Sequence, residues 1–339
     1  MSRALVGLSG LAGLALLVAL VVASGVDDLA ALLARAGWGL LWLVPFHALP
    51  IALDALGWRA LLAPVDPDRR AGIVFLWWVA SIREAINRLL PAGGVGGEVV
   101  GIRLALWRLP GGAAVTATVV AEVLLTLVNT DLFIALGLAI ALLLDGDRLA
   151  LALLAGVAVT LPLPVLLYAL LRHGALFGRI ERAVIGLLGE QSRIAALFGD
   201  AAVLDAELRQ LMARHRALLA ALGWQFAGMV AGAFEVWLGL ALLGHPVSPW
   251  VAIALEASGQ AVRHFAFFVP AGLGVQEAGF LVFGRLLGIP GEAALALSLA
   301  RRLRELGYGL PALASWHWAE ARRALARLPE RADNPVRPD

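Results

Sequence analysis

Four charged residues interrupt the last long apolar segment of the chain, Ala293–Trp318: Arg301, Arg302, Arg304 and Glu305. A charged side chain at the centre of a membrane span costs about 2.5 to 3.5 kcal/mol on insertion scales, so such residues usually have a function. At about 100° per residue, Arg301, Arg304 and Glu305 share one helix face, and Arg301 and Glu305 can pair at i, i+4. Because the planar guanidinium group binds oxyanions through two parallel hydrogen bonds, this face is a candidate site for a phosphate headgroup.

Two further apolar segments, Gly72–Arg108 and Trp250–Leu287, are each broken in the middle by proline and glycine. Both contain a Pro-Ala-Gly motif and, seven residues after the proline, a glutamate: Pro91, Gly93 and Glu98 in the first segment, and Pro270, Gly272 and Glu277 in the second. Chance similarity in a chain rich in alanine, glycine and leucine is the alternative. Because the spacing is kept along both segments, we predict an internal repeat, residues 72–144 and 250–318.

The two breaks predict irregular backbone inside the membrane. Proline removes a backbone donor, and glycine permits tight turns. In hydrocarbon, irregular backbone is tolerated only where protein or a water-filled cavity covers it, and inverted repeats with broken helices are typical of transporters. We therefore expect the breaks to line a cavity, with helix N-termini near Glu98 and Glu277 directing amide dipoles toward it. The residues concerned are Pro91, Gly93, Pro270, Gly272 and Gly274.

Composition indicates an integral membrane protein. The chain has 339 residues, 61% of them hydrophobic, and its apolar runs are long enough to cross about 30 Å of hydrocarbon. It has no cysteine, which excludes disulfides and thiolate chemistry. The net charge of +2 argues against nucleic-acid binding. Six full spans are predicted, of which the first could instead be a signal peptide: Ala4–Ser24, Gly37–Leu56, Ala113–Leu144, Leu149–Leu171, Ala217–Leu243 and Ala293–Trp318.

Loop charge predicts the orientation of the spans, because cytoplasmic loops are rich in basic residues. Arginines are concentrated in Arg59–Arg70, Arg172–Arg216 and the tail, residues 321–339, so we predict that these regions and both termini are cytoplasmic. Asp145–Asp147 and Gly244–Ser248 are then external. Each broken segment must cross an even number of times, which predicts two re-entrant hairpins from opposite sides, with full crossings as the alternative. The amphipathic pattern of Arg172–Arg216 predicts a segment on the cytoplasmic surface, either in the membrane interface or as a solvated helical hairpin.

The sequence around the breaks resembles the lysylphosphatidylglycerol synthase transmembrane, or flippase-like, family. The similar residues are Asn87–Gly93 with Gly96–Glu98 and the more specific block Phe267–Glu277, and the resemblance covers about residues 5 to 320. It implies movement of a lipid between the leaflets of a bacterial inner membrane. Bifunctional members carry a soluble aminoacyl-transfer domain after the membrane part; because this chain ends about twenty residues after its last span, we expect no synthase activity. A hopanoid-associated branch has a similar size, but no residue assigns the chain to it.

Charged residues on the repeated segments are the candidate lipid site. Arg302 corresponds in the repeat to Glu122, 180 positions earlier, and these opposite charges could form a gate or latch. We expect five arginines to bind the headgroup, and four glutamates to orient them or to bind a coupling proton. The arginines are Arg301, Arg304, Arg263, Arg88 and Arg83, and the glutamates are Glu98, Glu277, Glu122 and Glu305. Structural ion pairs that hold the bundle together are the alternative.

The sequence thus predicts an all-α polytopic membrane protein, with residues 1–320 as one domain of about eight hydrophobic segments. We expect alternating access, in which a charged headgroup passes through a polar central cavity. A non-transporting scaffold or lipid-binding partner of a lipid-biosynthesis system is the alternative, and an intramembrane enzyme has least support because no His-Glu-x-x-His motif occurs. The expected partners are membrane lipids and lipid-biosynthesis enzymes, not nucleic acid. No metal or cofactor is expected, and the oligomeric state is left open, a homodimer included.

Overall fold

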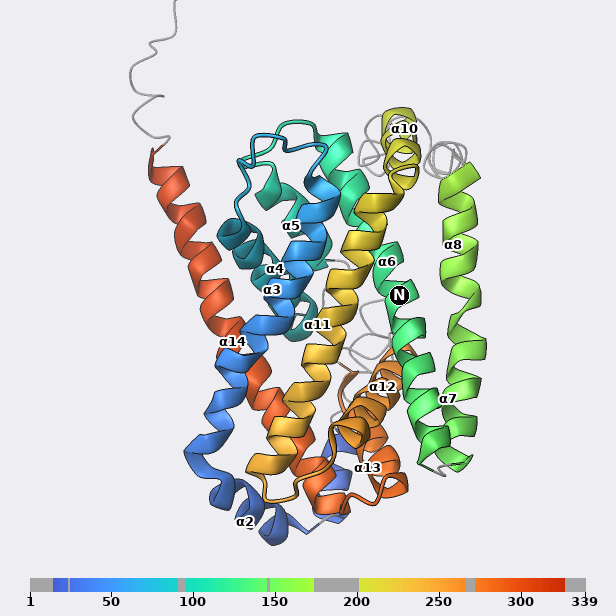
Figure 1. The fold of residues 1–339 in the computed structure, drawn as a ribbon. Coiled ribbons are helices and arrows are strands. Elements are labelled where there is room, and N and C mark those ends of the chain that lie inside the picture. Colours follow the sequence, from blue (N-terminus) through green and yellow to red (C-terminus); the bar gives the residue numbers. More distant parts are fainter. Residues whose placement is uncertain are drawn as a thin grey trace, which may run out of the picture.

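The computed structural model describes residues 15–23, 25–90, 96–144, 147–173, 201–265 and 272–326, and these residues contain helices and no strands. Four helices are long and apolar enough to cross a membrane: Leu29–Leu62, Gly112–Leu143, Ala150–Leu171 and His215–Leu242. Figure 1 shows the long helices running side by side between the two ends of the molecule. The prediction of an all-α membrane protein is therefore confirmed.

The N-terminal helices follow one another directly: α2 (Val26–Ala36), the 3-10 helix η1 (Gly37–Trp42) and α3 (Leu43–Leu62). The predicted span Gly37–Leu56 lies within them, and helix continues past its predicted end to Leu62. Pro50 lies inside α3, where its missing N–H removes one backbone hydrogen bond. Of the predicted span Ala4–Ser24, residues 15–23 are helical and the rest lies outside the described residues.

Two sets of three helices share the same order and similar lengths. The first unit consists of α4 (Ile73–Leu89), α5 (Gly96–Ala105) and α6 (Gly112–Leu143), and the second unit of α12 (Pro249–Phe265), α13 (Val275–Leu286) and α14 (Gly291–Ala326). These helices have 17, 10 and 32 residues in the first unit and 17, 12 and 36 in the second. In each unit the first two helices pack against each other as a hairpin. The two hairpins lie in opposite halves of the molecule (Figure 1), and their re-entry into the bilayer stays a prediction.

The predicted backbone breaks lie between the two arms of each hairpin. Pro91, Gly93 and Pro270 lie outside the described residues. Gly272 and Gly274 have φ angles of 59° and 74°, in the left-handed region that glycine adopts without steric cost. Gly274 directly precedes α13 as its N-cap residue, so the second break ends in backbone that favours glycine.

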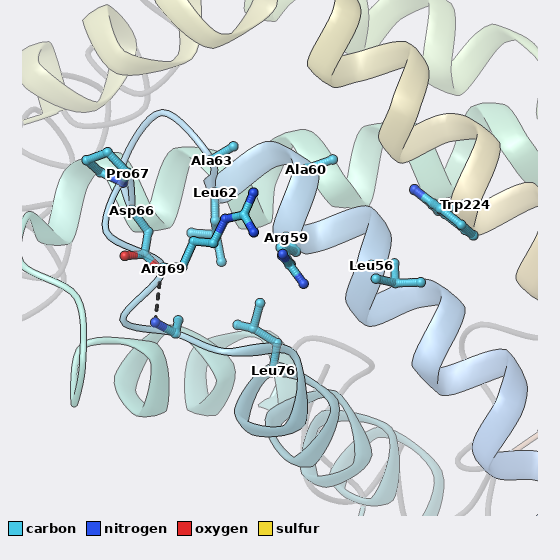
Figure 2. Close-up of a pocket in the computed structure, with 11 residues that line it drawn as sticks. Leu56, Arg59, Ala60, Leu62, Ala63, Asp66, Pro67, Arg69, Leu76 and Trp224 are labelled. Carbon is cyan, nitrogen blue, oxygen red and sulfur yellow. Dashed lines mark hydrogen bonds between the residues drawn. The ribbon is translucent and has the colours of Figure 1, made fainter.

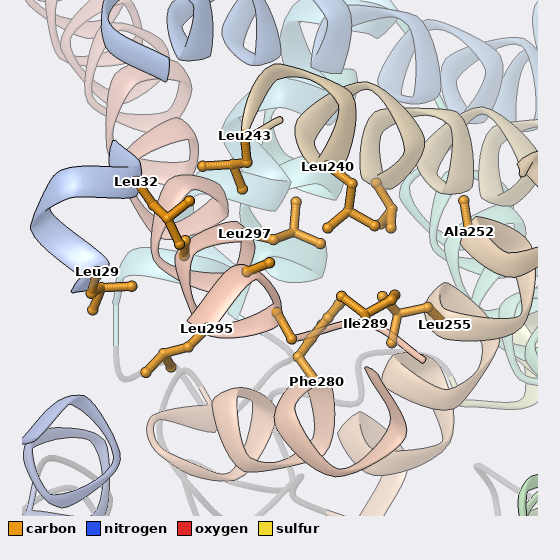
Figure 3. Close-up of a cluster of buried hydrophobic side chains, with 14 residues drawn as sticks. Leu29, Leu32, Leu240, Leu243, Ala252, Leu255, Phe280, Ile289, Leu295 and Leu297 are labelled. Carbon is orange, nitrogen blue, oxygen red and sulfur yellow. The ribbon is translucent and has the colours of Figure 1, made fainter. Parts of the chain in front are cut away.

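Each hairpin packs against the long helices through its own apolar cluster. One cluster joins α3 to the first unit: Trp58, Leu76, Ile82, Leu104 and Val119. The other joins α2 and α11 to the second unit (Figure 3): Leu32, Leu240, Leu255, Phe280 and Leu297. Because lipid tails are as apolar as leucine, such contacts stabilise a membrane bundle mainly through close packing. Each hairpin is thus held against the long helix of its own unit.

Four helices complete the described fold: α7 (Asp147–Thr160), α8 (Pro162–His173), α10 (Ala201–Met212) and α11 (His215–Leu242). The predicted span Leu149–Leu171 is divided at Leu161, because Pro162 has no N–H to continue the helix.

Residues 174–200 of the predicted segment Arg172–Arg216 lie outside the described residues. In α10, the buried leucines pack against α6 and α8, so this apolar face covers the bundle, and the position of the segment relative to the membrane stays a prediction.

The regions predicted to be cytoplasmic lie at one end of the molecule. In Figure 1 the α3–α4 loop, α10 and the last turns of α14 are at the upper end, whereas α2 and the α11–α12 connection are at the lower end. With 36 residues, α14 is about 54 Å long at about 1.5 Å per residue. It is long enough to cross, although its charged residues separate it from the four apolar spans. Which end faces the cytoplasm stays a prediction.

Candidate functional site

A set of ion-paired residues joins the two units inside the helix bundle. Its members are charged or titratable, lie on α3, α4, α5, α6, α11, α12, α13 and α14, and are all buried or half-buried. We call this set the central network: His47, Arg83, Glu84, Arg88, Glu98, Glu122, Glu235, Glu256, Arg263, Glu277, Arg301, Arg302, Arg304 and Glu305.

In the first unit, Arg83 of α4 lies between two carboxylates. Its Nη1 donates to Glu122 Oε2 of α6 at 2.8 Å, and its Nη2 donates to Glu98 Oε2 of α5. Asn87 donates to the other oxygen of Glu98 at 3.2 Å and accepts the N–H of Gly97 at 2.9 Å. Glu98, the third residue of α5, is therefore held beside the N-terminus of its helix, where the helix dipole favours negative charge.

In the second unit, Arg302 of α14 donates to Glu277 Oε1 of α13 at 2.9 Å and to Glu305 Oε2 at 3.1 Å. Glu277 is the third residue of α13, as Glu98 is of α5. Both units therefore pair the glutamate at the start of the short helix with an arginine, but the arginine comes from the first helix in one unit and from the third helix in the other.

His47 of α3 connects the two units. Its Nδ1 lies 2.8 Å from Glu235 Oε2 of α11, and its Nε2 lies 3.0 Å from Glu84 Oε2 of the first unit. Arg304 Nη1 of the second unit lies 2.9 Å from the same Nε2, and Arg304 Nη2 lies 3.0 Å from Glu235 Oε1. One imidazole ring thus contacts residues of three other helices.

The two neighbours of His47 Nε2 make opposite demands on it. The carboxylate of Glu84 needs a hydrogen on this nitrogen, whereas the guanidinium of Arg304 needs a lone pair there. Nε2 can satisfy only one of them in any tautomer or charge state. A proton gained or lost at His47 would therefore change which unit it binds.

The predicted gate between Glu122 and Arg302 is not formed by direct contact, because each residue pairs within its own unit. The predicted i, i+4 pair of Arg301 with Glu305 is also replaced. Arg301 reaches α12 instead and donates to Glu256 Oε2 at 2.6 Å, because this buried carboxylate lies opposite it. Glu305 pairs with Arg302 at i, i+3.

The five predicted headgroup arginines belong to the central network but differ in how firmly they are paired. Arg83, Arg301 and Arg304 each have a carboxylate oxygen at 3.0 Å or less. Arg88 lies 3.6 Å from Glu84 and 4.0 Å from Glu305, and Arg263 lies 3.5 Å from Glu256. Arg88 and Arg263 are therefore the arginines most free to bind another anion.

A small cavity lies beside these groups in the second unit. Its volume is about 10 Å³, about the space that one water molecule needs. Two buried nitrogen atoms among its lining residues, Arg263 Nε and Arg302 Nη2, make no hydrogen bond with any residue that the structure describes. In the described conformation the cavity is polar but too small for a lipid headgroup.

Asp54 is an exposed acidic residue close to the central network. It lies on the same face of α3 as His47 and Trp58, which are buried, yet Asp54 is exposed. On α6, Thr126 is likewise exposed although it shares a face with the buried Glu122. Asp54 lies within electrostatic range of Arg83, Glu84 and Glu122 and makes no ion pair with a described residue. Asp54 and Thr126 are therefore polar positions close to the central network that solvent-sized molecules can reach.

Glycines of α5 make room for the ion pairs of the first unit. A Cβ at Gly101 would lie 2.5 Å from Arg83 Cδ, and a Cβ at Gly97 would lie 2.8 Å from Asn87 Cγ. Any larger residue at Gly101 would displace the side chain that binds Glu98 and Glu122. These glycines are therefore positioning residues for Arg83.

His47, Asp54, Glu84, Glu235 and Glu256 are not among the site residues predicted from the sequence. His47 and Asp54 are polar residues within the apolar helix Leu29–Leu62, and this position is the signal that could have found them. Among the residues that the structure describes, no group of three His, Asp or Glu side chains is arranged to hold a metal ion.

Comparison with known proteins agrees with this architecture. Residues 8–312 match the family described as lysylphosphatidylglycerol synthase TM region. No curated protein and no solved structure matches the chain. The match covers far more than half of the chain and includes the first unit, the second unit as far as residue 312 and the whole central network. The chain therefore belongs to the lysylphosphatidylglycerol synthase transmembrane-region family.

Proposed function

We propose that this protein moves a lipid between the leaflets of the bacterial inner membrane, with its headgroup passing through the central network. The observation that carries this proposal is the buried network itself, in which both units and the long helices α3 and α11 contribute charges. Buried ionisable residues inside a membrane bundle are costly and usually mark a substrate or ion pathway. Two matching units around such a site are the arrangement found in many transporters.

The charges of the network suggest how a headgroup is accepted. Six arginines and seven glutamates largely neutralise one another in the described conformation. A headgroup phosphate takes the place of the glutamates around Arg88 and Arg263, since their ion pairs are the longest. Bidentate hydrogen bonds from guanidinium to phosphate compensate for the displaced carboxylates.

Alternating access follows from the position of the two hairpins. Movement of the α4–α5 hairpin opens the network to one side of the membrane, and movement of the α12–α13 hairpin opens it to the other. His47 links these movements, because its Nε2 can bind Glu84 of the first unit or Arg304 of the second but not both. The lipid tails stay in the bilayer throughout.

Exchange of labelled phospholipids in proteoliposomes tests this function. Dithionite bleaches a fluorophore only in the outer leaflet, so bleaching beyond half of the signal reports translocation. Wild-type protein should increase the exchange rate of at least one phospholipid class over protein-free liposomes, and Arg88→Gln with Arg263→Gln should abolish the increase. Arg103→Gln is the matched control, since Arg103 pairs with Glu320 at the exposed surface.

A non-transporting scaffold or lipid-binding partner of lipid-biosynthesis enzymes is the second candidate function. The same ion pairs would then serve only to hold the helices together. A scaffold predicts no exchange of any phospholipid by the wild-type protein, together with lower thermal stability of the Arg88→Gln/Arg263→Gln variant. That pair of results would overturn the proposed translocation.

A further inference from the structure

A larger pocket lies at the end of the bundle that carries the α3–α4 loop. Its volume is about 480 Å³, within the range of about 300 to 1,000 Å³ that is typical of small-molecule sites. Figure 2 shows that the end of α3, the loop, the start of α4 and Trp224 of α11 form it. None of its lining residues belongs to the central network.

Two arginines line this pocket without a carboxylate partner. Arg59 comes from the last turn of α3 and Arg69 from the loop (Figure 2), and neither forms an ion pair with a residue that the structure describes. Asp66 also lines the pocket, but its two oxygens accept the N–H groups of Arg70 and Ala71, each at 2.8 Å. The carboxylate is thus committed to the loop backbone, and both guanidinium groups stay available.

The backbone of the loop is strained at Arg69. Its φ angle of 54° lies in the left-handed region, which residues other than glycine rarely adopt. The Arg69 N–H donates to the carbonyl of Asp66 at 3.1 Å, and the Asp66 carboxylate fixes the next two residues. Strain of this kind persists where the surrounding structure enforces it, often at a ligand site.

Apolar groups lie next to the two arginines. Trp224, Leu56 and Leu76 line the same pocket, and Trp224 is exposed. Tryptophan is enriched where a membrane protein meets the headgroup region, because its ring is apolar and its N–H is polar. A cationic end beside an apolar wall fits an amphiphile that carries a phosphate.

We propose that this pocket binds the phosphate of an anionic membrane lipid at the end of the bundle. The inference rests on the proposed function, since it takes lipid as the substrate, and it adds a first binding site outside the central network. Arg59 and Arg69 hold the phosphate oxygens through charge-assisted hydrogen bonds, while the glycerol backbone and upper tails lie against Trp224 and Leu56. The lipid then enters the network from this end.

Isothermal titration calorimetry on the purified full chain in uncharged detergent tests the site. The probes are dihexanoylphosphatidic acid, dihexanoylglycerol and inorganic phosphate, which separate the phosphate from the lipid part. Wild-type protein should bind dihexanoylphosphatidic acid more tightly than either of the other two. Arg59→Gln with Arg69→Gly should weaken that binding by about tenfold or more, since hydrogen bonds to charged groups are lost.

Two choices keep the test interpretable. Glycine at position 69 suits the left-handed backbone, so the variant should fold, which a thermal unfolding midpoint at or above that of the wild type would show. Arg70→Gln is the matched control, because Arg70 lies in the same loop, pairs with Asp68 at 3.2 Å and does not line the pocket. It should bind dihexanoylphosphatidic acid like the wild type.

The site is refuted if the folded double variant keeps wild-type affinity for dihexanoylphosphatidic acid. Equal affinity of the wild type for dihexanoylglycerol would show that the phosphate is not recognised, and equal affinity for inorganic phosphate would show a site for free phosphate and not for lipid. Either result overturns the proposal. Lipid exchange by the Arg88→Gln/Arg263→Gln variant tests the central network separately, so failure of one proposal is distinguishable from failure of the other.

Discussion

His47 Nδ1 lies 2.8 Å from Glu235 Oε2, although the two residues are 188 positions apart in the chain. This contact joins α3, which precedes the first unit, to α11, which precedes the second. Glu84 and Arg304 then bind the other side of the imidazole ring, one from each unit. His47, which belongs to neither unit, therefore contacts both of them.

Replacement of His47 by phenylalanine should reduce both stability and transport. The apolar ring keeps the volume but leaves the buried Glu235 without one of its hydrogen bonds, at a cost of about 1 to 3 kcal/mol. We expect a lower thermal unfolding midpoint in detergent and loss of phospholipid exchange in proteoliposomes. His317→Phe is the control, since His317 is exposed and stacks on Trp316. Wild-type exchange by folded His47→Phe would exclude a role for His47 in linking the units.

Arg83 and Glu122 should show strong energetic coupling. Arg83→Gln leaves Glu98 and Glu122 unpaired in the bundle, and removal of one partner of a buried ion pair costs about 3 to 5 kcal/mol. In the double variant Arg83→Gln/Glu122→Gln, neither of these two charges remains, so the loss in unfolding free energy should be smaller than the sum of the single losses. Equilibrium unfolding in mixed micelles measures this cycle. Additive losses would mean that the two side chains do not interact.

Gly101→Val should disturb the first unit through Arg83. The added Cβ would lie 2.5 Å from Arg83 Cδ, so the guanidinium group must leave Glu98 or Glu122, and β-branched residues tolerate little adjustment in a helix. We expect a loss of thermal stability similar to that of Arg83→Gln. Gly223→Val is the control, because a Cβ at Gly223 in α11 meets nothing within 4 Å. Equal unfolding midpoints for the two variants would contradict the proposed positioning role of Gly101.

The helical membrane fold could be predicted because its signals are local. Long apolar runs predicted α6 and α11 within a few residues of their ends, and the family resemblance rested on short blocks around the two breaks. The spacing of Glu98 and Glu277 from the Pro-Ala-Gly motifs also placed both glutamates in the first turn of a short helix. Each of these features depends on neighbouring residues in the chain.

The partners of the charged residues could not be predicted, since they depend on how distant helices pack. Helical spacing alone suggested that Arg301 pairs with Glu305, but the bundle brings Glu256 of α12 within 2.6 Å of Arg301. The correspondence of Glu122 and Arg302 in the repeat suggested that these two residues pair with each other. In the structure, each of them pairs with a residue of its own unit. His47 and Asp54 lie on α3, outside the two repeated segments from which the site residues were predicted.

The proposed translocation requires an aqueous, polar passage through the bundle beside the central network. Thiol labelling tests it most directly, because the chain has no cysteine of its own. Thr126 is exposed on the face of α6 that carries the buried Glu122, and Leu303 is 61% exposed on α14 beside Arg302 and Arg304. Thr126→Cys therefore places a thiol on the face of α6 that carries Glu122. Leu303→Cys places a thiol among the exposed apolar residues Leu306 and Leu310 of α14, which we expect to face lipid.

In proteoliposomes, a small membrane-impermeant thiol reagent should modify Thr126→Cys and leave Leu303→Cys unmodified, because thiolates form only where water is present. Modification of Thr126→Cys should also slow phospholipid exchange, since the adduct occupies the passage. Mass spectrometry of the intact protein measures the modified fraction for both variants. If Thr126→Cys stays as unreactive as Leu303→Cys during active exchange, the headgroup does not pass beside the central network.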